Sequence, residues 1–173
     1  TTFNVIILVM KKTKVLVVAN WKMNPDTYKE AEEIFAGSVG AIKKNSKIQV
    51  VLCLPYTWLT DFSHKYAKAV TFGAQDAALE KIGPQTGEIS PNMLVSSAVK
   101  YVLLGHSERR ALGESDDMVS KKVLNSLKSG LAVILCVGEK ERDTHGEYLH
   151  FLRQQIINSL NKVSKRYIKK LII

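Results

Sequence analysis

The sequence predicts an α/β fold with parallel strands. Short apolar runs alternate with segments in which apolar residues recur every three or four positions, as expected for strands that are each followed by an amphipathic helix. The runs are apolar at consecutive positions, which is typical of strands buried on both faces of a sheet. This pattern alone leaves two architectures equally open, a doubly wound open sheet and a piece of a (β/α)8 barrel with about five βα units.

The expected elements follow one another in strict alternation. Pro25 to Thr27 offers a helix start, and Ser115 and Gly130 are the expected N-cap and C-terminal stop of a later helix. Gly, Pro, Ser and Asn are concentrated in residues 77–92, which predicts a long loop. We expect strands at 14–19, 48–54, 70–74, 101–104 and 131–137, the opening of a sixth at 170–173, and helices at 25–42, 57–67, 115–130 and 149–163.

Composition favours a globular domain. Apolar residues make up 46% and charged residues 24% of the 173 positions, and no apolar run approaches the ~20 residues of a membrane span. The net charge of +9 comes from scattered lysines without interleaved aromatic residues, so we expect neither a nucleic-acid nor a membrane partner. Cys53 and Cys136 lie in apolar runs and are expected to be buried free thiols in a reducing, cytoplasmic location.

Three polar clusters follow expected strands, at the strand ends where parallel sheets bind ligands. The first is Asn20-Trp-Lys-Met-Asn24, whose Lys22 can offer a cation to an anionic substrate, although a lysine in such a place is most often solvated. The second is Gly105-His-Ser-Glu-Arg-Arg110, and the third is Gly73-Ala-Gln-Asp76. The third is weak by itself, because a turn-rich projection carries no specific chemistry.

His106 is the candidate for acid–base or electrophilic chemistry. A histidine held neutral where a strand meets a helix can donate a hydrogen bond to a carbonyl oxygen that becomes negative. A lone histidine is more often structural than catalytic. A catalytic role for His106 is favoured more than usual by its polar and charged neighbours, Ser107, Glu108 and Arg109. An acid and an arginine at a strand end can also lock neighbouring loops. The other histidines lack metal-ligand spacing, so no metal is expected.

Taken together, the clusters resemble the triosephosphate isomerase family in residue identity, order and spacing. The resemblance covers about residues 13–173. It rests on the three clusters above, on Thr86-Gly-Glu-Ile-Ser90 in the loop, and on Cys136-Val-Gly-Glu139 after the fifth strand. It implies a partial (β/α)8 barrel over residues 10–173. Residues 1–9 would be an upstream extension or a cloning remnant, in which Val5–Val9 either adds an edge strand or is disordered.

The resemblance also implies a reaction and a set of roles. The reaction interconverts dihydroxyacetone phosphate and glyceraldehyde 3-phosphate through an enediolate in glycolysis and gluconeogenesis, without a metal or cofactor. His106 and Lys22 would be catalytic, and Asn20 and Lys22 would bind substrate. Ser107 and Glu108 would support the site, and the loop residues Thr86, Gly87 and Glu88 would contact a neighbouring subunit.

The sequence departs from the family near its end. The family's catalytic base is a glutamate in a Tyr-Glu-Pro-Val-Trp-like motif after strand six, and the printed sequence stops at Ile173, a residue or two before such a position. The lid and the phosphate-binding loops of the later strands are also not in it. We therefore expect a truncated homologue that is inactive alone, with Glu139 as the nearest substitute carboxylate. Open sheet edges predict a homo-oligomer. Two alternatives remain open: a non-catalytic self-assembling protein, and one half of a split isomerase.

Overall fold

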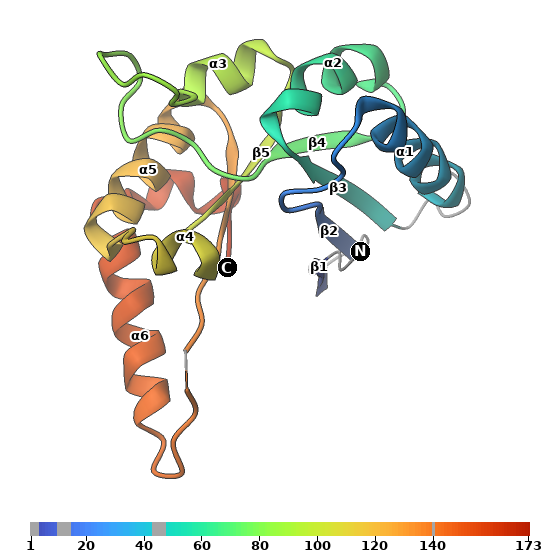
Figure 1. The fold of residues 1–173 in the computed structure, drawn as a ribbon. Helices are drawn as coiled ribbons and strands as arrows, with labels where there is room; N and C mark the ends of the chain where they lie inside the picture. Colours follow the sequence, from blue (N-terminus) through green and yellow to red (C-terminus); the bar gives the residue numbers. More distant parts are fainter. Residues whose placement is uncertain (1–3, 10–14, 43–47, 140) are drawn as a thin grey trace. The chain divides into compact units, whose positions relative to one another are not determined.

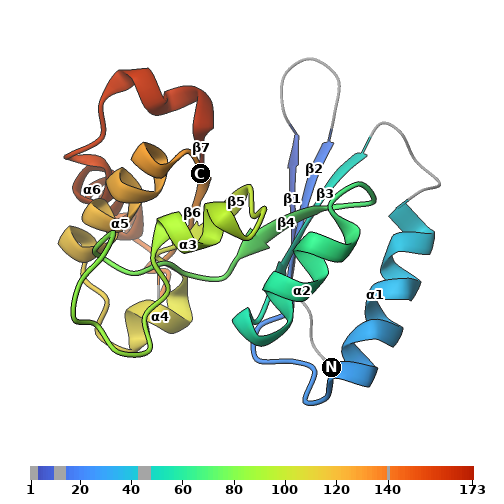
Figure 2. The same ribbon diagram turned by 90° about the horizontal axis from the view of Figure 1, so that it is seen from above.

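The computed structural model describes residues 4–9, 15–42, 48–139 and 141–173, which fall into two compact units (Figures 1 and 2). The first unit comprises Thr1–Gln75 and Ser96–Tyr101, and the second comprises Asp76–Val95 and Val102–Ile173. Residue 10, where the expected barrel domain begins, lies outside the described residues. In each unit, strands that are neighbours in the sequence are neighbours in the sheet.

The first unit is built from four strands and two helices. Its strands pair in the order β1-β2-β3-β4, with β2, β3 and β4 parallel and β1 antiparallel to β2. The sequence predicts the three parallel strands and both helices of this unit. The elements are β1 (Asn4–Val9), β2 (Val15–Asn20), α1 (Tyr28–Ile42), β3 (Ile48–Leu54), α2 (Tyr56–Tyr66) and β4 (Thr71–Ala74).

Aromatic side chains hold the two helices of this unit on the sheet. Phe35 of α1 lies 5.1 Å from Phe62 of α2 and 5.9 Å from Phe72 of β4, measured between ring centroids. All three rings are at most 3% exposed, and such pairs contribute beyond the apolar area that they bury. Thr27 caps α1, since its hydroxyl accepts a hydrogen bond from the N–H of Glu30 at 3.2 Å. Figure 2 shows α1 and α2 side by side against these strands.

The second unit contains the remaining elements, except for Ser96 at the end of α3 and Tyr101 at the start of β5. Its strands follow the order β5-β6-β7, and β6 and β7 are parallel. Helices α5 and α6 lie side by side (Figures 1 and 2). The elements after β4 are α3 (Pro91–Ser96), β5 (Tyr101–Leu104), α4 (Ser107–Ala111), α5 (Asp116–Ser129), β6 (Ala132–Leu135), α6 (Glu147–Leu160), the 3-10 helix η1 (Lys165–Lys170) and β7 (Leu171–Ile172).

Helix α5 begins and ends where the sequence predicts. The hydroxyl of Ser115 accepts a hydrogen bond from the N–H of Met118 at 3.3 Å, and Gly130 is left-handed with φ 104°. Val119, Val123 and Leu127 recur at helical spacing and form the buried stripe of α5, at most 2% exposed. The predicted sixth strand is present as β7.

Three short helices were not predicted, because α3, α4 and η1 each span only five or six residues. So short a segment shows no helical period. The expected loop accordingly ends at α3, and α6 ends at Leu160 instead of residue 163. Both cysteines are free thiols, and Cys53 is buried as expected, whereas Cys136 is only half-buried. Among the described residues, no helix has both the length and the apolar character needed to cross a bilayer.

Candidate active site

The segment after β2 forms a fixed turn that presents Lys22. The N–H of Trp21 donates to the carbonyl of Cys53 at 3.0 Å, so the parallel ladder with β3 extends one residue past the strand. Lys22 then takes a left-handed conformation with φ 55°, an uncommon state for a residue with a side chain. The side-chain oxygen of Asn20 accepts from the N–H of Lys22 at 2.9 Å and stabilises this turn. Asn20 is only 5% exposed, so its role is partly structural.

Gln75 fastens the same turn, a role that the sequence analysis did not assign. Its side-chain nitrogen donates to the carbonyl of Lys22 at 2.9 Å and to the carbonyl of Cys53 at 3.1 Å. The residue two positions before it must be glycine, because a Cβ on Gly73 would lie 2.6 Å from the sulfur of Cys53. Gly73 and Gln75 of the Gly-Ala-Gln-Asp cluster therefore help to position the Lys22 turn.

His106 is the N-cap of α4, directly after β5. Its Nδ1 accepts a hydrogen bond from the backbone N–H of Glu108 at 3.3 Å, so Nδ1 carries no proton and the ring's N–H is at Nε2. The carboxylate of Glu108 lies 3.5 Å from the same nitrogen and is 57% exposed. We assign the tautomer of His106 from the backbone hydrogen bond. An ion pair with the Glu108 carboxylate would need a proton on Nδ1, and the backbone N–H of Glu108 already points at that nitrogen. The Nε2–H is then the group that His106 offers to a ligand.

Arg110 fixes the turn that precedes His106. Its Nε donates to the carbonyl of Gly105 at 2.7 Å, and its Nη1 lies 2.6 Å from Asp116 of α5. Its Nη2 reaches the hydroxyl of Ser159 of α6 at 3.3 Å. Gly105 has φ 69°, and a Cβ there would lie 2.9 Å from the Arg110 guanidinium. A side chain at position 105 would therefore strain the backbone and displace the arginine.

Four charged residues form a largely buried cluster beside this turn. Nζ of Lys122 lies 2.8 Å from Asp76 and 2.5 Å from Glu114, and all three residues are at most 8% exposed. Arg109 is the second cation, with Nε 2.9 Å from Asp76 at an angle that makes an ion pair and not a hydrogen bond. The arginine that was expected to lock neighbouring loops thus acts through Asp76. Two cations balance two carboxylates, which buried charges require.

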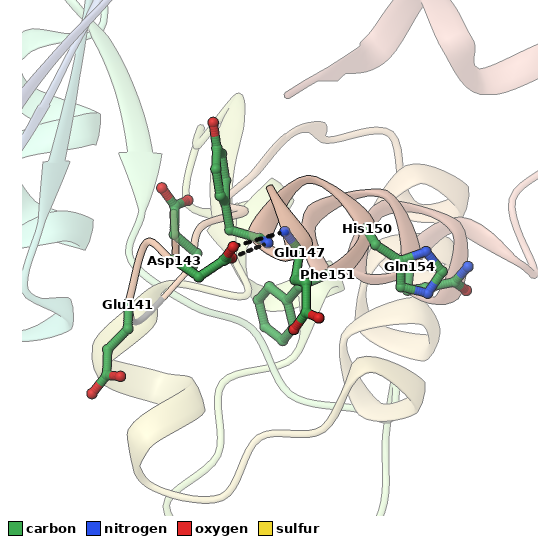
Figure 3. A pocket seen from close by; sticks show the side chains of 8 residues that line it. Glu141, Asp143, Glu147, His150, Phe151 and Gln154 are labelled. Atoms are coloured by element: carbon green, nitrogen blue, oxygen red, sulfur yellow. Dashed lines mark hydrogen bonds between the residues drawn. The ribbon is translucent and has the colours of Figure 1, made fainter. Parts of the chain in front are cut away.

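The segment after β6 lines a surface pocket of about 770 Å³ (Figure 3). Glu139 accepts two contacts from Arg142, at 2.9 and 2.6 Å, and its own backbone N–H together with this arginine lowers the pKa of its carboxyl group. Asp143 accepts from the N–H groups of His145, Glu147 and Tyr148 at 2.7–3.1 Å. These bonds outweigh the effect of burial and lower the pKa of Asp143. Both carboxylates therefore already accept hydrogen bonds from neighbouring groups, Glu139 from Arg142 and Asp143 from backbone N–H groups.

The remaining acids of this pocket do not gather into a site. In Figure 3, Glu141 lies apart from Glu147, and His150 lies near Gln154, away from Glu141 and Asp143. In the described ranges, no group of three or more His, Cys, Asp or Glu side chains is arranged to hold a metal ion.

Cys136 lies at the end of β6, where its backbone N–H donates to the carbonyl of Leu104 at 2.8 Å. Burial raises the pKa of its thiol to about 11, and the charge of Arg110 opposes this shift only in part. Gly138, two residues on, donates its N–H to the side-chain oxygen of Gln155 at 2.8 Å, which ties the segment to α6. Cys136 therefore acts as a packed thiol and not as a nucleophile.

The loop before α3 carries the expected subunit-contact residues. Thr86, Gly87 and Glu88 are all exposed, and Gly87 has φ 88°. The base of the loop is closed by a hydrogen bond from the N–H of Ala78 to the carbonyl of Ile89 at 2.8 Å. The loop therefore projects into solvent from a fixed base.

The candidate residues divide between the two units. Asn20 and Lys22 belong to the first unit, and His106, Ser107, Glu108 and the projecting loop belong to the second. Within each unit the polar groups follow strand C-terminal ends, and each of the two turns is held by a buried or half-buried side chain, Gln75 or Arg110. Sequential pairing of parallel strands, with polar groups at the strand C-terminal ends, is the arrangement of a protein of the (β/α)8-barrel class.

Comparison with known proteins specifies this class further. The model of the family described as triosephosphate isomerase matches residues 15–173. The triosephosphate isomerases of Natranaerobius thermophilus and Thermoanaerobacter pseudethanolicus are 36% and 38% identical over 87% and 91% of this chain. These matches cover 59% and 64% of the two relatives. The chain belongs to the triosephosphate isomerase family, and it spans about 60% of the length of these curated relatives.

A solved structure supports the same assignment. The crystal structure of triosephosphate isomerase from Bartonella henselae superposes with a TM-score of 0.80 at 31% identity, over 91% of this chain and 65% of that protein. The fold is thus a partial (β/α)8 barrel, as the resemblance predicted. Of the two architectures that the pattern left open, the doubly wound sheet is excluded.

Proposed function

We propose that residues 15–173 form the part of a triose-phosphate isomerase that binds the substrate and polarises its carbonyl group. The observation that carries this proposal is the hydrogen bond from the Glu108 N–H to Nδ1 of His106. It leaves Nε2–H as the donor to a carbonyl oxygen, and such a donor is most effective when the oxygen gains negative charge. An enediolate intermediate develops its charge on that atom.

The Lys22 turn supplies the second part of the proposal. Asn20 and Gln75 hold the backbone N–H and the carbonyl of Lys22, so less backbone conformational entropy is lost when an anionic substrate binds. Lys22 then offers positive charge to the phosphate or to the developing enediolate. Ser107 and Glu108 support His106 from the first turn of α4.

We further propose that a polypeptide limited to these 173 residues does not convert triose phosphates catalytically. General base catalysis contributes about 10²–10⁴ in rate, and the nearest candidate base, Glu139, is held ionised by Arg142. A carboxylate fixed in an ion pair is a poor acceptor for a proton on carbon. The other members of the catalytic constellation lie, in this proposal, on the later strands of a complete barrel.

Infrared spectroscopy of bound dihydroxyacetone phosphate tests the carbonyl role directly. We expect the C=O stretch of the bound ketone to fall relative to the free ketone, and the shift to disappear in His106→Gln. Lys22→Met is the matched variant. We expect it to weaken binding of the ketone, but the C=O stretch of the ketone that still binds should be shifted as in the unmodified protein. An unshifted carbonyl in the unmodified protein would refute the electrophile role.

An isomerase assay distinguishes the alternatives. We expect no activity above that of His106→Gln from the 173-residue polypeptide. Activity that appears on mixing with a polypeptide carrying strands six to eight would favour a split isomerase. A folded oligomer without affinity for triose phosphate would favour a non-catalytic self-assembling protein.

We propose a homo-oligomer in which Thr86, Gly87 and Glu88 contact a second subunit, with open sheet edges as additional contacts. The exposure of this loop supports the contact. A cytoplasmic protein of glycolysis and gluconeogenesis agrees with the family and with the free thiols. Sedimentation of Thr86→Arg beside the unmodified protein tests the interface, and an unchanged mass would count against this loop.

A further inference from the structure

Strand β1 pairs with one edge of β2 in an orientation that no strand of a (β/α)8 barrel has. Asn4 lies opposite Asn20 and Val9 lies opposite Val15, so the two strands are antiparallel over six residue pairs. The other edge of β2 pairs in parallel with β3. Both edges of β2 are therefore occupied within the first unit.

A closed (β/α)8 barrel needs that same edge for another strand. All eight barrel strands are parallel, and closure joins the first strand to the last. β2 is the first barrel strand of this chain, because the family match begins at residue 15. An antiparallel neighbour at this position cannot be the closing strand. We propose that β1 occupies the closing edge of the barrel, and that a parallel strand which completes the barrel must first displace it.

The backbone groups involved make the two states mutually exclusive. In an antiparallel ladder, every second residue of β2 directs its N–H and C=O toward β1. Barrel closure uses the same groups, and each N–H makes one strong hydrogen bond at a time. The edge of β2 can thus be paired with β1 or with the closing strand, but not with both.

The sequence of β1 suits it to this position. It reads Asn-Val-Ile-Ile-Leu-Val, without a charge, a proline or a glycine, and four of its six residues are β-branched. An unpaired edge of the equally apolar β2 would be a template for pairing with other chains. β1 covers this edge of β2 within the same polypeptide. When β1 is displaced, the free edge of β2 can pair with a parallel, extended strand, as barrel closure requires.

Hydrogen exchange of the 173-residue protein tests the pairing. The variant Ile6→Pro/Ile7→Pro removes two successive N–H groups, one of which must face β2, and Ile6→Val/Ile7→Val is the matched control that keeps strand propensity. We expect alternate amides of Val15–Asn20 to exchange at least roughly tenfold faster in the proline variant. The intervening amides, which face β3, should keep their protection and show that the unit is folded. The proposal would be overturned if every amide of Val15–Asn20 exchanged at the same rate in the proline variant as in the valine control.

Binding of a complementing barrel piece tests the displacement. The probe is the C-terminal piece of the Thermoanaerobacter pseudethanolicus relative, taken from the end of its match with this chain. We expect the proline variant to bind it at least roughly tenfold more tightly than the unmodified and valine proteins, because a site blocked nine-tenths of the time has a tenfold weaker apparent affinity. Equal affinities, or no binding by the proline variant, would overturn the proposal. The test needs no catalysis, so failure of the isomerase proposal gives a different result.

Discussion

The backbone N–H of Glu108 donates to Nδ1 of His106 at 3.3 Å, so the first turn of α4 fixes the tautomer of the ring that caps it. We expect ¹⁵N spectra of the neutral form to show an unprotonated Nδ1 and a protonated Nε2 at His106. Glu108→Pro removes the N–H donor at a helix position that tolerates proline, and should let the tautomers mix. The exposed His64 is the internal reference. A protonated Nδ1 in the neutral, unmodified protein would contradict the assignment.

Gln75→Leu should destabilise the first unit by about 1–3 kcal/mol, because two carbonyl oxygens lose their hydrogen-bond donor. Urea unfolding gives the change in free energy, and faster amide exchange at Lys22 would locate it. Gln49→Leu is the control, since Gln49 makes a single bond to the hydroxyl of Tyr101 at 3.2 Å and should cost about 0.5–1.5 kcal/mol. Equal costs would mean that Gln75 does not hold the turn.

Lys122→Met should destabilise the second unit by about 3–5 kcal/mol, because the buried carboxylates of Asp76 and Glu114 lose their shared cation. The adjacent Lys121 pairs with Asp117 at the surface, and Lys121→Met should cost at most about 1 kcal/mol. Adding Asp76→Asn and Glu114→Gln to Lys122→Met should recover part of the loss in urea unfolding. No recovery would show that the cost arises from packing and not from charge.

Asp117 should contribute to acid sensitivity. Hydrogen bonds from Lys121 and Lys162 lower its pKa from 3.8 to about 2. A carboxyl group whose folded pKa lies below its unfolded pKa stabilises the protein above the unfolded value, and this contribution is lost as the pH falls from about 4 to about 2. Asp117→Asn should therefore lower the urea midpoint at neutral pH and lose its difference from the unmodified protein in acid. The surface variant Asp26→Asn is the control, and a difference that persists in strong acid would refute the linkage.

Cys136 should resist alkylation at mild pH. With a thiol pKa of about 11, only about a thousandth of it is thiolate at pH 8, against about a quarter for an ordinary cysteine. Iodoacetamide labelling followed by peptide mass analysis should show a rate that rises about tenfold per pH unit up to about pH 10. The urea-unfolded protein, in which the burial is removed, provides the control. Fast labelling of the folded protein at neutral pH would contradict the assigned burial effect.

The helices and strands that the sequence predicts are those whose causes are local. The stripe and caps of α5 are visible within sixteen residues, from Ser115 to Gly130, whereas α4 and η1 are too short to show a period. The candidate residues could be proposed from the sequence because they stand in motifs: His106, Lys22 and Asn20. The contacts that hold the two turns were not predicted, because the partners are distant in the chain: Gln75 donates to a carbonyl 53 residues away, and Arg110 reaches a hydroxyl 49 residues away. The buried ion pair of Lys122 was missed for the same reason, since its carboxylate partner is 46 residues away.

Pairing of strands in sequence order has a consequence for how the chain folds. β3 joins β2 with paired residues 33 positions apart, β4 joins β3 at 20, and β7 joins β6 at 38. The entropy lost on closing each connection depends on its own length and grows only slowly with it. During synthesis, the strand with which each new barrel strand pairs has therefore already left the ribosome. The loop-closure entropy lost on adding a βα unit is about the same for each unit and does not grow with the total length of the polypeptide.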